Sequence, residues 1–355
     1  MSVTSVGAKV VSPHERGFTL IEVMVAVVLA AIVAAAAFTI LTTTTKAVGA
    51  NEQVVDTQQD VRIAMELLSR DVKMAGFGSP GVPVGNCTYS IMPADNKPTG
   101  SDTGPDSVQL LVPTTKSTGA TPWQLQGATS PNGATQIVLK AGAVSDMVAS
   151  GLANGSYISI NGAHTGQVTN VASASDTITV LVPAPVWFPA NSPVYLLQCI
   201  RYQVVTNAAV CGSTEPCLTR GIAGVTAGPS AEAPIVEGIE DLQLAYACDG
   251  CVAAINGGNP DRVIDNQAGS AGFDQLDFIS NNAWATPPLT PDKIKLVEIS
   301  LVASQPRSDG GFGETLQAKI GSGTLQVSAD HTLPANTNHR RRMLKKTVDT
   351  RNVGL

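Results

Sequence analysis

Apolar residues follow three different patterns along this chain, and the first is a long uninterrupted run. From residue 23 to residue 41 the sequence has no charge and no proline, and nearly every position is Val, Ala, Leu, Ile, Met or Phe. Counted back to Phe18, a helix with a rise of about 1.5 Å per residue spans a hydrocarbon core roughly 30 Å thick. The run therefore predicts a membrane-spanning helix over residues 18–41.

The second pattern is a helical stripe in the same proline-free stretch. Its apolar residues recur at helical spacing, and charged residues, Asp71 among them, are expected on the other faces. The stripe consists of Val54, Val61, Met65, Leu68, Val72 and Ala75. Gly76, Gly78 and Pro80 are typical of a helix end. Residues 42–78 are thus predicted to form an amphipathic half of the helix that packs on the rest of the chain.

The third pattern, beyond residue 79, consists of short alternating segments separated by turn residues, which predicts mainly antiparallel sheet. The strand candidates are 107–112, 135–139, 156–160, 177–182, 193–205, 235–246, 275–280 and 294–303. The stretch from residue 156 to residue 181 reads as a small β-rich insertion. The predicted fold class is α+β, with a long N-terminal helix packed on an antiparallel β-sheet head.

Composition and charge limit the classes of function that the protein can have. Charged residues are 14% and aromatic residues 4% of the chain, with 33 glycines and 22 prolines, which suits short strands and many turns. A net charge of −6 argues against nucleic acid as the main ligand. One basic run, residues 340–346, is predicted to be an edge strand protected by its charge. Contact of this run with DNA phosphates is the alternative.

All six cysteines lie after residue 80, which favours an oxidising compartment on one side of a membrane. Six cysteines allow about fifteen pairings. Short spacing favours Cys211–Cys217 and Cys248–Cys251, which leaves Cys87–Cys199. For Cys248 and Cys251 a structural disulfide is preferred, because no helix pattern follows them. A redox site and half of a metal site are the alternatives.

The remaining candidates are a calcium-binding loop and a catalytic nucleophile. The acidic, glycine-rich stretch 256–277 offers Asp261, Asp265 and Asp274, whose oxygens suit calcium, but no EF-hand spacing is present. A solvated loop is the preferred interpretation, so no cofactor is expected and calcium is the alternative. No histidine lies in a recognisable nucleophile context, and GxSxG, HExxH and P-loop motifs do not occur. We therefore expect no enzyme.

The residues before the apolar run carry a family resemblance. Residues 17–22, GFTLIE, directly precede the helix and resemble the processing motif of type IV prepilins and type II secretion pseudopilins. The resemblance implies cleavage between Gly17 and Phe18 by a prepilin peptidase and N-methylation of Phe18. It also implies that Glu22 pairs with the N-terminal amine of a neighbouring subunit. The leader would be residues 1–17, and its slight positive excess places the N-terminus in the cytoplasm.

Later segments extend the resemblance to one branch of that group. VEGIEDLQLAYACDG (236–250), IKLVEISLVASQPR (294–307) and HRRRMLKKTVDTRNVGL (339–355) resemble segments of PilW-like minor pilins, which are related to J-type pseudopilins. The match implies a pilin-like fold with a PilW-like head at 191–355. Residues 79–190 match poorly and are interpreted as a β-rich elaboration.

What the resemblance implies is a structural function. The protein would be a minor pilin that is anchored in the inner membrane with a periplasmic head and then enters an extracellular type IV pilus, near its tip. It would prime or cap assembly with other minor pilins and the major pilin, and a tip adhesin is a further possible partner; no nucleic acid is expected. The alternatives are a type II secretion minor pseudopilin, a membrane-anchored adhesin or DNA-binding module, and a CxxC redox protein.

Overall fold

The computed structural model of the protein describes residues 18–78, 81–97, 102–115, 121–129, 135–181, 187–224, 232–267, 272–305, 325–334 and 339–353. The chain forms two compact units, Met1–Glu52 and Gln53–Leu355. The predicted leader, residues 1–17, and Pro80 lie outside the described residues.

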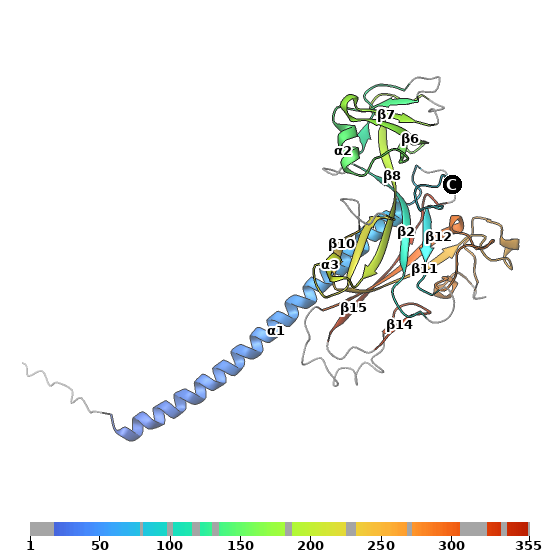
Figure 1. Ribbon diagram of the computed structural model, residues 1–355. Coiled ribbons are helices and arrows are strands. Elements are labelled where there is room, and N and C mark those ends of the chain that lie inside the picture. The colour runs from blue at the N-terminus through green and yellow to red at the C-terminus, as the bar shows by residue number, and fades with distance from the viewer. Residues whose placement is uncertain are drawn as a thin grey trace, which may run out of the picture. The chain divides into compact units, whose positions relative to one another are not determined.

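One long helix, α1, runs from Leu20 to Met74 (Figure 1). It continues without a break through the polar run at residues 42–45. There each threonine hydroxyl donates to a carbonyl oxygen three or four residues earlier, for example Thr44 to Ile40 at 2.8 Å. Because these hydroxyls are satisfied by the helix itself, the run is compatible with an apolar environment.

The helix ends in a turn that only glycine fits. Gly76 has φ +80°, and a Cβ built on it would lie 2.6 Å from the Ser90 hydroxyl oxygen and 2.7 Å from the Asn352 carbonyl oxygen. The Gly76 N–H also donates to the Leu111 carbonyl oxygen at 2.8 Å. The end of the helix is thereby fixed against strand residues of the head.

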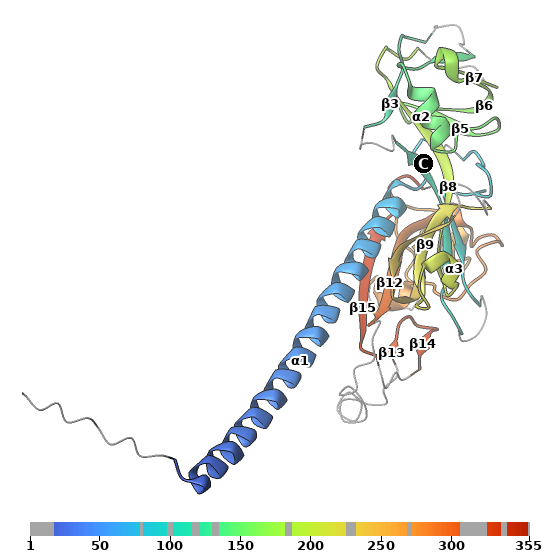
Figure 2. The same cartoon turned by 60° about the vertical axis from the view of Figure 1, so that its left-hand side comes forward.

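Strands are the main regular elements of the remaining chain (Figures 1 and 2). They are β1 Ile91–Ala94, β2 Ser107–Thr114, β3 Trp123–Gln124, β4 Gln136–Val138, β5 Tyr157–Ile160, β6 His164–Ala172, β7 Thr177–Val180, β8 Pro193–Val205, β9 Cys217–Ile222, β10 Ala233–Glu237, β11 Ile239–Cys248, β12 Ile294–Ser304, β13 Leu325–Gln326, β14 Thr332–Leu333 and β15 Arg341–Asp349. The shorter helices are α2 Ala143–Ala149, α3 Ala208–Cys211 and the 3-10 turns η1 Ser173–Ser175, η2 Asn256–Gly258, η3 Gln275–Asp277 and η4 Pro291–Lys293.

All strand pairs described are antiparallel, as the alternating pattern predicts. A ten-stranded sheet has the order β1-β2-β8-β5-β6-β7-β4, with β3 and β9 also paired to β8 and β10 paired to β9. A three-stranded sheet has the order β11-β12-β15, and β13 pairs with β14. The predicted α+β class is confirmed.

The two largest hydrophobic cores of the described residues lie in the second unit, and β8 contributes to both. The larger core joins the helix stripe, including Leu68 and Val72, to both large sheets. The smaller core lies within residues 123–196, between α2 and the strands of the insertion. Tyr202 of β8 is buried in the first core, and Leu196 of the same strand is buried in the second.

Two strand predictions are wrong in detail. Residues 235–246 do not form one strand, because Gly238 adopts φ +75° and divides the segment into β10 and β11. Residues 275–280 contain η3, and Ile279 makes just an isolated bridge to Tyr246. Here the Asp274 and Asp277 side chains form a reciprocal capping box that starts a helical turn. The alternation of apolar residues does not detect either feature.

Replacement of Gly76 by alanine tests the helix end. We expect Gly76→Ala to lower the free energy of unfolding by about 2 kcal/mol or more, since left-handed backbone costs an L-residue roughly 1–2 kcal/mol and the new Cβ meets packed atoms. Gly81→Ala is a matched control, because Gly81 has φ +67° with nothing within 4 Å of its added Cβ. Urea unfolding of the full chain in detergent measures both, and equal losses would contradict the packing role.

Candidate functional site

The apolar end of α1 begins with a capping box. Thr19 precedes the first helical residue, and Glu22 follows three positions later. The Glu22 Oε2 atom accepts hydrogen bonds from the Thr19 backbone N–H at 3.1 Å and from the Thr19 hydroxyl at 3.0 Å. In return the Glu22 N–H donates to the Thr19 hydroxyl oxygen at 3.3 Å. The box satisfies donors that the first helical turn leaves without partners.

Glu22 therefore has a partner within its own chain. The family resemblance implies that Glu22 pairs with the N-terminal amine of a neighbouring subunit, and it assigns no function to Thr19. The Thr-x-x-Glu spacing, a general signature of helix N-termini, would have indicated this pair from sequence. Phe18 is 86% exposed, and Gly17 lies outside the described residues.

The helix that follows carries its apolar side chains on the outside. Every side chain from residue 18 to residue 41 is exposed in the single chain. The large apolar ones include Leu20, Ile21, Met24, Leu29, Ile32, Phe38 and Leu41. The helix is long and apolar enough to cross a membrane. Exposed apolar surface of this extent marks a site for lipid or for apolar protein partners.

The other end of α1 is joined to the head by a buried polar cluster. The Asp71 carboxylate accepts hydrogen bonds from the Tyr202 hydroxyl at 2.7 Å and from the Arg220 Nε at 2.9 Å. Burial and the Asp71 carboxylate raise the pKa of Tyr202. Burial tends to lower the pKa of Arg220, but the Asp71 carboxylate and Tyr202 together outweigh burial and raise that pKa. Asp71 thus links the helix to β8 and β9.

The expectation that Asp71 lies on an outer face of the helix is wrong. Its side chain is 8% exposed and lies beside the apolar stripe. Asp71 follows Leu68 by three positions and precedes Ala75 by four, which is stripe spacing. Because Asp71 is charged, a pattern built from apolar residues alone does not include it.

The Asp71 cluster is testable by truncation. We expect Asp71→Ala to reduce the free energy of unfolding by about 2–4 kcal/mol, because it leaves Tyr202 and Arg220 without their partner. Since Arg220 is partly exposed, the loss should be smaller than for a wholly buried pair. Glu66→Ala, on an exposed position of the same helix, should change it by less than about 0.5 kcal/mol. Equal effects in urea unfolding would count against the cluster.

The six cysteines form three disulfides, Cys87–Cys199, Cys211–Cys217 and Cys248–Cys251. The first joins residues separated by 112 positions and fixes the segment before β1 to β8. Closing so long a loop restricts the unfolded chain most. The other two are local, spanning six and three positions.

The surroundings of Cys248 and Cys251 suit a structural disulfide. Both residues are at most 3% exposed, whereas a redox-active pair must be reached by a thiol. Asp265 lies beside them, and its carboxylate accepts N–H bonds from Gly250, Cys251 and Val252 at 2.9–3.0 Å. An anion held by three donors anchors the loop and does not present free ligands to a metal.

The calcium candidates are each used by the backbone of their own loop. Asp265 accepts the three bonds just described. Asp261 Oδ1 accepts the Val263 N–H at 3.0 Å, and Asp274 Oδ1 accepts the Leu276 N–H at 2.8 Å. These contacts order the loop as turns.

Residues 341–346 of the basic run lie on β15, which pairs with β12 and forms an edge of its sheet, as predicted. Arg341 forms an ion pair with Glu240, and Lys345 forms one with Glu298 at 2.6 Å. Part of the positive charge is therefore neutralised within the head.

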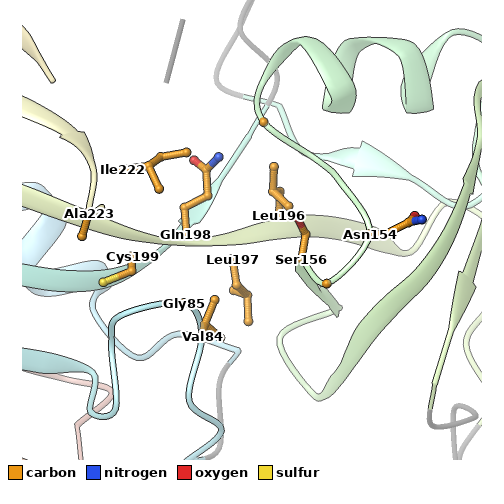
Figure 3. A pocket seen from close by; sticks show the side chains of 12 residues that line it. Val84, Gly85, Asn154, Ser156, Leu196, Leu197, Gln198, Cys199, Ile222 and Ala223 are labelled. Atoms are coloured by element: carbon orange, nitrogen blue, oxygen red, sulfur yellow. The ribbon is translucent and has the colours of Figure 1, made fainter. Parts of the chain in front are cut away.

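One cavity of about 320 Å³ lies beside the Cys87–Cys199 disulfide (Figure 3). Val84 and Gly85 line it on one side, Leu197 and Cys199 of β8 on another, and Asn154 and Ser156 reach it from the insertion. None of its lining side chains is an acid, a base or a free thiol. The lining therefore offers no acid or base for catalysis and none that would activate the Ser156 hydroxyl as a nucleophile.

Comparison with known proteins addresses both ends of the chain. Residues 12–38 match the family model for the prokaryotic N-terminal methylation motif, and residues 201–352 match the model for Type IV Pilus-assembly protein W. No curated protein matches the chain. Among solved structures, a type IV-like pilin from Thermus thermophilus is 12% identical, with a TM-score of 0.34, over 84% of this chain and 98% of that chain.

Proposed function

This chain is a PilW-like minor pilin of the type IV pilus, a member of a structural family without enzymatic activity, and from that premise we propose that it primes pilus assembly. The observation that carries the proposal is the combination of a prepilin processing motif with a directly following helix whose apolar side chains are all exposed. Such a helix is stored in lipid and is then used as a packing surface for other pilins.

The proposed mechanism is packing. In the membrane, lipid covers the apolar helix; in the filament, helices of neighbouring pilins cover it instead. Each Leu, Ile or Phe side chain moved out of water is worth about 1.5–3 kcal/mol, so the segment cannot stay in solution between the two states. The head makes lateral contacts with other minor pilins, with the major pilin below and with a tip adhesin if one is present.

Glu22 changes partner in this mechanism. In the free subunit its carboxylate closes the capping box with Thr19. After cleavage, the amine of Phe18 in a neighbouring subunit offers a charged donor, and the pair strengthens as lipid and water leave. The box prevents the cost of an unsatisfied carboxylate until then. The presence of the acid supports a place below another subunit. A position near the tip, with the head outside the membrane, is part of the same proposal.

Processing is tested at the predicted cut. Gly17→Ala should block removal of residues 1–17 and methylation of Phe18, because the peptidase then meets a side chain at the scissile position. N-terminal mass spectrometry of the membrane fraction measures both. A shortened, methylated chain in this variant would refute the assigned cleavage site.

Two functions of Glu22 are separated by paired variants. Glu22→Gln keeps the capping box, since Gln serves at this position, but removes the charge. We expect it to leave insertion and cleavage intact and to reduce incorporation into sheared pili severalfold, as Glu22→Ala should. Thr19→Ala removes the box and keeps the charge, and it should incorporate far better than Glu22→Gln. If Glu22→Gln incorporates normally, the charge pairing is excluded and helix capping is the function of Glu22.

A further inference from the structure

Three carboxylates from distant parts of the head meet at one point. Asp95 follows β1, Asp102 precedes β2, and Asp330 lies in the turn between β13 and β14. One carboxylate oxygen from each residue lies within 4.8 Å of the corresponding oxygens of the other two. The backbone supports this meeting, since the Asp102 N–H donates to the Asp330 carbonyl oxygen at 3.1 Å.

Asp102 is the unusual member of the group. It is 7% exposed, and both of its carboxylate oxygens are buried without a hydrogen-bond partner of normal geometry among the described residues. The Thr103 N–H and the Gln243 amide lie close enough to lower the pKa of Asp102, but neither makes such a bond. A buried carboxylate without partners costs several kcal/mol. We therefore expect a bound partner beside the Asp102 carboxylate in the functional protein.

Asp95 and Asp330, which meet Asp102 at this point, can each accept further bonds. Asp95 accepts one N–H bond on each oxygen, from Lys97 at 2.7 Å and from Asn282 at 3.1 Å. Asp330 Oδ1 accepts the Ser328 hydroxyl at 2.6 Å. A carboxylate has about four lone-pair sites, so each acid retains sites for a further bond. Among the described residues no Lys or Arg forms an ion pair with any of the three.

The charges around this point repel one another. Burial, followed by the charge of Asp330, raises the pKa of Asp102. Burial also raises the pKa of Asp95, and Asp102 adds to that effect. Neighbouring Asp106 is buried, and its pKa is raised to about 8. The nearby His331 acts in the opposite direction on the pKa of Asp102, and its Nε2 atom lies 3.4 Å from Asp241. Among the described residues, three carboxylates are thus held together at one point, where the charge of one opposes the ionisation of the next.

We propose that Asp95, Asp102 and Asp330 bind one divalent cation of the calcium class. Calcium takes carboxylate oxygens at about 2.3–2.6 Å, so ligands on opposite sides of the ion are roughly 4.6–5.2 Å apart, which accommodates this cluster. Mg²⁺ requires shorter bonds of about 2.0–2.1 Å and a strict octahedron. Three carboxylates and water complete a calcium shell, and the ion converts mutual repulsion into attraction.

The ion would connect three segments that the sheets do not join directly. It ties the connection between β1 and β2 to the β13–β14 turn, and through Asp95 to the segment at Asn282. This location differs from the loop of Asp261, Asp265 and Asp274, whose carboxylates hold backbone N–H groups. The proposed effect is to fix the surface of the head beside β11, independently of how the helix functions in assembly.

The test uses the full chain in detergent, treated with EDTA and then freed of it. Titration with CaCl₂ in a calorimeter should show one site, with MgCl₂ binding at least tenfold more weakly. Saturating CaCl₂ should raise the unfolding temperature by several degrees. Asp102→Asn should weaken CaCl₂ binding at least tenfold and abolish this rise. Without calcium, the same variant should unfold at the temperature of the unchanged protein or above it, because one repelling charge is gone.

Three comparisons make the result decisive. Asp330→Asn, in the turn, should also weaken CaCl₂ binding at least tenfold and serves if Asp102→Asn does not fold. Asp292→Asn removes an exposed charge elsewhere and should bind like the unchanged protein. The proposal is overturned if the unchanged protein shows neither heat nor a temperature shift with CaCl₂. It is equally overturned if Asp102→Asn or Asp330→Asn binds with unchanged affinity, or if Asp261→Asn alone abolishes binding.

Discussion

The rest of the head depends on the burial of one face of α1. Val61, Met65, Leu68 and Val72 are each at most 4% exposed and pack against strands of both large sheets. Each such side chain contributes about 1.5–3 kcal/mol, more than an exposed ion pair at about 0–1 kcal/mol. The stripe therefore provides the stability, and the Asp71 cluster fixes the register of the helix against β8 and β9. The Gly76 turn then directs the chain into the head.

The same helix serves two environments because its two halves have different surfaces. From residue 18 to residue 41 the side chains are apolar on all sides, so no orientation around the helix axis is preferred in lipid. From residue 57 onward a single stripe is buried, and charged side chains such as Glu66 remain exposed. The threonine run at 42–45 stands between the halves and bonds to its own helix. Anchoring and head packing thus need not compete for the same side chains.

Carboxylates in the head illustrate how burial separates structural acids from candidate ligands. Asp249, Asp265 and Asp277 are each at most 4% exposed, and all three accept backbone N–H bonds that order loops. Asp102 has comparable burial, and its carboxylate oxygens have no hydrogen-bond partner of normal geometry among the described residues. Residue type and spacing do not separate these two kinds, since the acids that look like ligands in the sequence are satisfied by their own loop. The less conspicuous ones converge from distant segments.

The sequence by itself determined the features that are local. The processing motif, the length of the apolar helix, the helical stripe, the antiparallel strands and the edge position of β15 follow from neighbouring residues or from periodicity. What it did not determine depends on contacts between distant segments. Leu68 reveals the stripe but not that Asp71 beside it is buried, because its partners Tyr202 and Arg220 are more than a hundred positions away. Gly238 divides a strand through its backbone angle, and Asp95, Asp102 and Asp330 meet through sheet topology. Periodicity records which side of an element is apolar, whereas only tertiary structure decides which polar groups are brought together there.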